Sequence, residues 1–226
     1  PAEVYGHSPT TLYKLDPTTK TVTDVCDFDG CTSVIDIALD AQSRLFGTTT
    51  SSLYAIDRGT AKCTLVASDG YPNSLSFVPA GTVDPAVEAL VGYDGSQYVR
   101  IDPVTGKKSN IGTLGGGYVS SGDIVSVKGG GTYLTVKGGS CNDCIVEVNP
   151  STGALIKKLG DIQHVDVFGL AFWGGSAYGF DNSGELFEIT FLASSVKATP
   201  IAMGTKPAGL QFWGAGSTTS APVTPR

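Results

Sequence analysis

Hydrophobic and polar residues alternate on both sides of a short Asp-Pro turn near the start of the chain. Residues 12–15 alternate before Asp16 and Pro17, and a second short alternating run follows the turn. Alternation with a period of two residues is typical of a half-buried β-strand, and an Asp-Pro pair favours a tight turn. The segment is therefore predicted to be a hairpin of two antiparallel strands.

The hairpin pattern returns four more times along the chain. Its equivalent turn positions are Asp16, Asp57, Asp102, Asn149 and Thr190. Two further strand-like runs precede each hairpin after the first, which makes four strands in each repeat of about 40–45 residues, a period typical of a propeller blade. We therefore predict an all-β fold, a five-bladed β-propeller with four antiparallel strands in each blade.

The two ends of the chain predict how the ring closes. Only one strand-like run, residues 3–7, precedes the first hairpin, so the first blade lacks a strand. Residues 209–214 (Gly-Leu-Gln-Phe-Trp-Gly) copy residues 169–174 (Gly-Leu-Ala-Phe-Trp-Gly). We expect residues 209–214 to supply the missing innermost strand, which would hide the open sheet edges. Trp173 and Trp213 are then expected at the far end of innermost strands, packed between blades.

Composition divides the chain into one domain and a tail. Residues 1–215 hold the repeats, whereas residues 216–226 are dominated by Ser, Thr, Ala and Pro and have no periodic apolar face. Such a segment cannot bury enough apolar surface to order itself. We expect a single propeller domain over residues 1–215 and a disordered linker or tail over residues 216–226 that can tether the domain.

Charge and hydropathy exclude two classes of partner. The formal net charge is −6, and the Lys and Arg residues form no run longer than a doublet. Nucleic-acid binding relies on clustered basic residues, so no nucleic-acid partner is expected. No apolar segment approaches the length of a membrane span, so no transmembrane segment is expected. We expect a monomer that needs no cofactor.

Four of the five cysteines form two pairs that are close in the sequence, Cys26 with Cys31 and Cys141 with Cys144. They can form two local disulfides or provide thiolate ligands for zinc. Zinc would need all four thiolates together although the pairs belong to different repeats, so disulfides are favoured. Cys63 has no evident partner and is expected to be a buried free thiol.

Disulfides form in oxidising compartments. Together with the Ser/Thr/Pro tail and the near absence of Met and His, the paired cysteines indicate a secreted, periplasmic or cell-surface protein.

The hairpin motif also resembles that of a known group of proteins. Residues 98–106 (Tyr-Val-Arg-Ile-Asp-Pro-Val-Thr-Gly), with residues 12–18 and 145–153, are similar to the "LYxIDPxTG" repeat of exported bacterial propellers of the YncE and quinoprotein-like kind. The resemblance covers most of residues 3–214 and implies a propeller fold and export. It carries no catalytic residue across, because the motif encodes a strand, a turn and a strand. No cofactor-docking motif is present, so quinone binding is not expected.

Motifs for catalysis and metal binding are few. No nucleophile elbow, zincin, phosphate-loop or dinucleotide fingerprint occurs, and two histidines, His7 and His164, are too few for a His-rich centre. Residues 27–30 and 181–184 have the acidic turn composition of a calcium loop but lack its distal bidentate Glu. We therefore predict no metal centre.

The mouth of the central channel is the candidate binding site, because loops between blades gather there. Aromatic, amide, hydroxyl and charged side chains in these loops suit a small polar ligand such as a carbohydrate, or a partner protein. The candidate ligand-binding residues are Tyr71, Asn73, Tyr118, Ser121, His164, Asp166 and Lys206. Alternatively, these side chains only satisfy the loop backbone.

Two acidic residues, Asp36 and Asp123, fall on predicted innermost strands and can both reach the channel. If both face inward, they can bind a cation or form the carboxylate pair that some hydrolases use as acid and base. A purely structural role is the alternative. Three functions therefore remain open: a binding module, a hydrolase or lyase, and a structural scaffold. The enzyme requires acids with raised pKa values beside a preformed cleft, and the scaffold requires a broad apolar patch.

Overall fold

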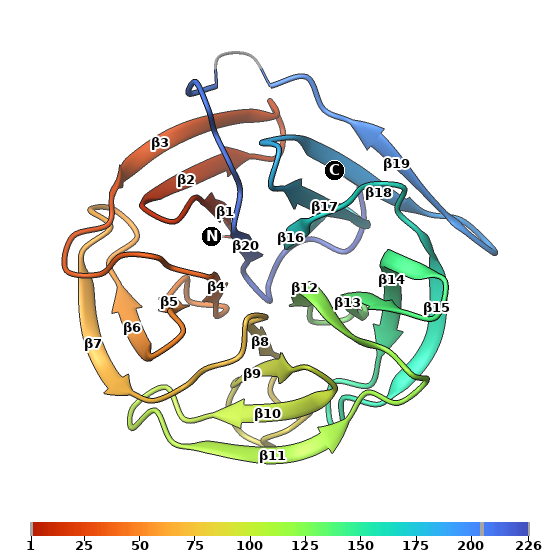
Figure 1. Ribbon diagram of the computed structural model, residues 1–226, viewed down its shortest axis with the longest axis horizontal. Helices are drawn as coiled ribbons and strands as arrows, with labels where there is room; N and C mark the ends of the chain where they lie inside the picture. The colour runs from red at the N-terminus through yellow and green to blue at the C-terminus, as the bar shows by residue number, and fades with distance from the viewer. Residues whose placement is uncertain (1, 204–205, 226) are drawn as a thin grey trace.

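Twenty antiparallel strands form a ring of five four-stranded sheets in the computed structural model, which describes residues 2–203 and 206–225 (Figure 1). Figure 1 looks along the axis of this ring, with one strand of each sheet near the centre and one at the rim. The predicted all-β, five-bladed propeller is thus confirmed.

The five sheets, numbered here as blades from the N-terminus, have the following strands from the centre outward. Blade 1 contains β20 (Gly214–Ser217), β1 (Val4–His7), β2 (Thr11–Asp16) and β3 (Thr21–Asp27). Blade 2 contains β4 (Asp36–Leu39), β5 (Leu45–Thr48), β6 (Ser52–Ile56) and β7 (Cys63–Ser68). Blade 3 contains β8 (Ser76–Val78), β9 (Ala89–Asp94), β10 (Gln97–Ile101) and β11 (Lys108–Thr113). Blade 4 contains β12 (Val119–Ser126), β13 (Thr132–Gly138), β14 (Cys141–Val148) and β15 (Leu155–Asp161). Blade 5 contains β16 (Val167–Trp173), β17 (Ser176–Asp181), β18 (Leu186–Phe191) and β19 (Val196–Pro200).

The repeated Asp or Asn holds the outer hairpin turn in four blades. Oδ1 of Asp16 accepts hydrogen bonds from the backbone amides of Thr18 and Thr19 at 2.8 and 3.1 Å. Asp57, Asp102 and Asn149 accept from the amides two and three residues later in the same way. The repeated motif thus encodes an Asx turn. Thr190, the expected fifth turn position, lies within β18 instead.

Burial decreases from the centre of the ring to its rim. Every residue of β4, β8 and β20 is buried, whereas most residues of the outermost strands β3 and β15 are exposed or half-buried. The apolar core lies between neighbouring blades. One cluster joins Tyr93 and Tyr98 of blade 3 to Leu134 and Val146 of blade 4, all 0% exposed. Such contacts stabilise the ring in proportion to the apolar surface that they remove from water.

The C-terminal strand completes blade 1, as predicted, but it is not the expected segment. β20 spans Gly214–Ser217 and pairs with β1, with Val4 opposite Ser217 and His7 opposite Gly214. The assignment of the strand to residues 209–214 is therefore wrong. Leu210 and Phe212 are buried instead in the cluster between blades 1 and 5. Small residues occupy the strand because the centre is crowded: a Cβ on Gly214 would lie 2.3 Å from Nε2 of His7.

The expected domain boundary at residue 215 falls inside β20 and is also wrong. Thr218, Thr219 and Ala221 are buried as well, and the Thr218 hydroxyl accepts a hydrogen bond from the backbone amide of Glu3 at 3.2 Å. The Pro222 carbonyl accepts from the amide of Gly174 at 2.7 Å. These contacts order a polar segment that composition alone assigns to a disordered tail. Pro1 and Arg226, at the ends of the expected domain and tail, lie outside the described residues.

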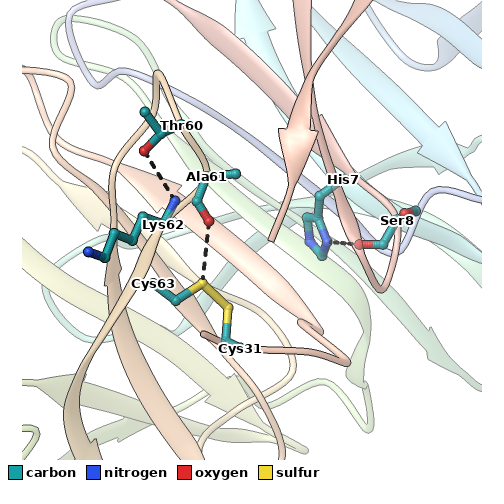
Figure 2. The surroundings of a disulfide bond; sticks show 7 residues. All are labelled: His7, Ser8, Cys31, Thr60, Ala61, Lys62 and Cys63. Carbon is teal, nitrogen blue, oxygen red and sulfur yellow. Dashed lines mark hydrogen bonds between the residues drawn. A yellow bond between two sulfur atoms is a disulfide. The ribbon is translucent and has the colours of Figure 1, made fainter. Parts of the chain in front are cut away.

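One of the two expected disulfides is present and the other is replaced. Cys141 and Cys144 are bonded. Cys31, however, is bonded to Cys63 (Figure 2), and Cys26 is an exposed free thiol. The assignments of Cys26 to a disulfide and of Cys63 to a free thiol are therefore wrong. The reason is a pairing between the loop after β3 and the start of β7: the amide of Cys63 donates to the carbonyl of Asp29 at 2.7 Å.

Candidate functional site

A pocket of about 220 Å³ lies at the mouth of the central channel, where the five innermost strands begin. Each blade contributes one residue, which lies in or within three residues of its innermost strand. The lining residues are Ile35, Asn73, Gly122, Phe168 and Trp213. Because the five blades converge here, the pocket is formed by the ring as a whole.

The lining combines apolar walls with one amide. Ile35, Phe168 and Trp213 are half-buried, and Asn73 is exposed. An indole ring offers a flat apolar face, and a side-chain amide both donates and accepts hydrogen bonds. The mouth therefore suits a small ligand with one apolar face and at least one polar group. Trp213 was expected at the far end of its strand and instead lies at the mouth, immediately before β20.

Asp36 and Asp123 directly follow the lining residues Ile35 and Gly122 in the sequence. They lie deeper in the channel, and both are 0% exposed. Asp36 accepts from the amides of Ile37 at 2.8 Å and of Leu75, in blade 3, at 2.6 Å. Asp123 binds the amides of Ile124 and of Leu170, in blade 5, both at 2.6 Å. Each carboxyl group therefore connects its own innermost strand to that of the next blade.

The two carboxyl groups also hydrogen-bond to each other. Burial, followed by repulsion from Asp123, holds the pKa of Asp36 well above its usual range. Burial likewise raises the pKa of Asp123 to about 8. All four oxygens accept backbone amides and neither residue lines the pocket, so this geometry supports a structural role for the pair.

His7 lies next to this pair in a fully buried position. A Cβ on Gly214 would meet both Nε2 of His7, at 2.3 Å, and Oδ1 of Asp36, at 2.5 Å, so these two groups flank the same backbone position. Nδ1 of His7 is 2.8 Å from the Ser8 carbonyl, the contact drawn as a dashed line in Figure 2. Nε2 has no hydrogen-bond partner among the described residues. Burial lowers the pKa of His7 to about 4.

Neither of the two tyrosines expected at the mouth lines its pocket. Tyr71 is buried between blades 2 and 3, and its hydroxyl donates to the Gly106 carbonyl at 2.9 Å. Tyr118 packs against the cluster between blades 3 and 4. Their rings fill the grooves between blades because these grooves can bury more aromatic surface than an open loop can.

The other expected residues are distributed around the mouth, and only Asn73 lines its pocket. The Ser121 hydroxyl donates to Asp143, and Lys206 donates to the Gly184 carbonyl at 3.1 Å. His164 and Asp166 line a separate pocket at the junction of blades 4 and 5. The lining residues that the sequence analysis missed include Ile35 and Phe168. They could have been found because each directly precedes an Asp or Gly of an innermost strand, Asp36 and Gly169 respectively.

Solved structures show the same fold at low sequence identity. The chain is similar to one in the crystal structure of a nidogen/laminin complex, with a TM-score of 0.53 and 11% identity over 98% of this chain and 82% of that one. It is similar to a protein of unknown function from Bacteroides caccae, with a TM-score of 0.51 and 12% identity over 96% and 98% of the two chains. It also matches TolB from Acinetobacter baumannii, with a TM-score of 0.54 and 16% identity over 92% of this chain and 51% of TolB.

At these identities the likeness concerns the fold alone. No protein-family model matches the chain, and no curated protein matches its sequence. The described residues contain no apolar helix of membrane-spanning length. The class established by fold and topology is therefore the five-bladed β-propeller, a fold that serves binding and protein interaction in many proteins.

Proposed function

We propose that the protein is an exported binding module that holds a small polar ligand, of carbohydrate type, at the mouth of its channel. The observation that carries this proposal is the pocket lined by one residue from each blade. A carbohydrate ring has an apolar face that can stack on Trp213, and its hydroxyl groups can bond to the Asn73 amide. Export is supported by the two disulfides, which form in oxidising compartments.

The size of the pocket limits the ligand. A volume of about 220 Å³ is below the roughly 300–1,000 Å³ of pockets that hold drug-sized molecules. A single sugar ring, or the end of a longer chain, is therefore a better match than a fully enclosed oligosaccharide. Binding of a whole partner protein would have to use the rim as well as the pocket.

Fluorescence of Trp213 provides a direct test. Trp173→Phe leaves Trp213 as the single tryptophan reporter, and neutral monosaccharides and their methyl glycosides are titrated into this variant. We expect a saturable change in emission for at least one sugar. Asn73→Ala should weaken its binding by about 1 kcal/mol, the usual net contribution of one hydrogen bond.

Asn110→Ala is the matched control, because Asn110 is an exposed amide on β11 that bonds to Gln97 and lies away from the mouth. This variant should bind as the parent does. If no sugar changes the emission, or if Asn73→Ala and Asn110→Ala behave alike, the carbohydrate site does not lie at the channel mouth.

A further inference from the structure

A second pocket, about 510 Å³ in volume, lies at the junction of blades 4 and 5. Its residues come from the connection between β15 and β16 and from the turn between β17 and β18 (Figure 1). Register places it on the same rim as the mouth, because Asp181 at the end of β17 pairs with Val167 at the start of β16.

Three side chains of this pocket direct metal-binding atoms at one another. Nδ1 of His164 is 3.3 Å from Oδ2 of Asp181 and 3.9 Å from Oε2 of Glu185. One nitrogen or oxygen atom from each residue lies within 4.8 Å of the other two. The set combines an imidazole with two carboxylates, which are ligands that zinc accepts in proteins.

The turn between β17 and β18 fixes the orientation of the Asp181 carboxylate. Its Oδ1 accepts hydrogen bonds from the amide of Ser183 at 3.0 Å, the hydroxyl of Ser183 at 2.6 Å and the amide of Glu185 at 3.0 Å. These three bonds hold Oδ1 in the turn and leave Oδ2 facing His164. Such support of a ligand by neighbouring donors is typical of metal sites, where it fixes the position of the coordinating atom.

His164 is held in place by an aromatic contact. Its ring stacks on Phe187 with 3.8 Å between ring centroids and 14° between the ring planes. Phe187 is 0% exposed and belongs to the apolar cluster between blades 4 and 5. The imidazole therefore cannot swing freely into solvent, and Nδ1 stays next to Oδ2 of Asp181.

Asn182 provides a separate observation that favours a bound ion or water in this pocket. Its Oδ1 atom is buried, and no hydrogen-bond donor contacts it among the residues that the structure describes. Asn182 lines the same pocket as the three ligand residues. Leaving a buried oxygen without a hydrogen-bond partner is unfavourable, and a water bound in this pocket could donate to it.

We propose that His164, Asp181 and Glu185 form a site for a divalent transition-metal ion, with Zn²⁺ as the best match. Tetrahedral zinc with ligand bonds of about 2.0–2.1 Å places its ligand atoms roughly 3.3 Å apart, which is the separation of Nδ1 and Oδ2. Glu185 is 59% exposed, so its carboxylate is free to move the remaining distance. One coordination position is left for water or an outside ligand.

Charge balance favours a cation over a simple ion pair. Two carboxylates face one imidazole, so even a protonated His164 leaves a net negative charge in the cluster. A dipositive ion bound to neutral imidazole neutralises both carboxylates. The imidazole nitrogen makes Zn²⁺ a better match than Ca²⁺ or Mg²⁺, which prefer oxygen ligands. This site is separate from the proposed ligand pocket at the mouth and does not depend on it.

The test uses the full chain in a Cys26→Ser background, because the exposed free thiol of Cys26 could bind added zinc by itself. Protein freed of metal with a chelator is titrated with ZnCl₂ by calorimetry, and MgCl₂ and CaCl₂ are titrated in parallel. We expect one Zn²⁺ per chain, with no comparable heat from the other two ions. Glu185→Gln and His164→Gln should each weaken Zn²⁺ binding at least 10-fold.

Asp166→Asn is the matched control, since it removes a charge from the same pocket without touching the three ligands. Asp166 has a φ of 56°, a left-handed conformation that Asn also adopts readily, so the fold should be preserved. This variant should bind Zn²⁺ as the parent does. Thermal melting without metal checks that every variant is folded.

Two results would overturn the proposal. One is the absence of stoichiometric Zn²⁺ binding by the folded parent. The other is binding that persists unchanged in folded Glu185→Gln and His164→Gln, or that Asp166→Asn weakens equally.

Discussion

The carboxyl groups of Asp36 and Asp123 hydrogen-bond to each other across the channel, although blades 2 and 4 are not neighbours in the ring. Each acid also binds the amide of the next blade, at Leu75 and Leu170 respectively. The pair thus connects four of the five blades through their innermost strands. Because both groups are fully buried and hold protons to a higher pH than an ordinary Asp, they make the stability of the ring depend on pH.

The first prediction is that stability falls as the pH rises towards 8. The pKa of Asp123 is raised to about 8 by burial, whereas an unfolded Asp titrates near 3.9. Between these two pKa values the folded state binds a proton that the unfolded chain has lost. The free energy of unfolding therefore falls by about 1.4 kcal/mol per pH unit for each such proton. His7 acts in the opposite sense below about pH 6.5, because its pKa is lowered to about 4 and the unfolded chain binds the proton there.

Between about pH 4 and 6.5 the effect of His7 opposes that of the acid pair, and above that range only the acid pair acts. From pH 6.5 to 8 we expect a loss of about 2 kcal/mol, or roughly 4–8 °C in melting temperature for a chain of this size. Calorimetric melting across this range measures the loss. Asp123→Asn should flatten the profile, while Asp24→Asn, an exposed acid on β3, should leave the slope unchanged. An equal slope in all three proteins would contradict the assignment.

The second prediction concerns ring closure. A chain ending at residue 213 lacks β20, so β1 loses its inner partner and an open sheet edge appears. This truncation should unfold or associate, as measured by sedimentation and circular dichroism. A chain ending at residue 222 keeps Thr218, Thr219 and Ala221 buried. Its free energy of unfolding should lie within about 1 kcal/mol of that of the full chain. Coinciding melting curves for all three chains would show that β20 is not required.

The third prediction concerns the disulfides. Peptide mapping without reduction should find Cys31 linked to Cys63 and Cys141 linked to Cys144, with Cys26 alkylated in the folded protein. Loop entropy gives about 3–4 kcal/mol for the first bond, whose cysteines are 32 residues apart, and about 2 kcal/mol for the second.

Replacing both Cys31 and Cys63 with Ser should therefore lower stability more than replacing Cys141 and Cys144. Denaturant unfolding compares the two double variants. A peptide joining Cys26 to Cys31 would refute the pairing.

The fourth prediction concerns the crowded centre. A Cβ on Gly214 would lie 2.3 Å from Nε2 of His7 and 2.5 Å from Oδ1 of Asp36, both fully buried. Gly214→Ala should therefore destabilise the fold by about 1–3 kcal/mol, the usual cost of overpacking. Gly59→Ala provides the control, because its nearest neighbour, Oδ1 of Asp57, would be 3.4 Å away. Equal denaturation midpoints for the two variants would be inconsistent with this packing.

The sequence alone determined the blade count and the strand order. Alternation and the recurring Asx turns at Asp16, Asp57, Asp102 and Asn149 are local signals, because each depends only on residues within one hairpin. The bond between Cys141 and Cys144 is local as well, since it joins residues three positions apart. Such features can be predicted from nearby residues without knowledge of the rest of the fold.

Contacts between blades were decided only by the tertiary structure. Tyr71 was expected at the mouth but is buried between blades. Cys63 is bonded to Cys31 because the start of β7 pairs with the loop after β3. The likeness of residues 209–214 to residues 169–174 reflects a shared need for apolar packing, whereas the strand itself requires the small side chains of β20. Positions that are far apart in the chain meet at these places. Which residues contact each other there depends on how their side chains pack in three dimensions, and the sequence pattern alone does not predict that packing.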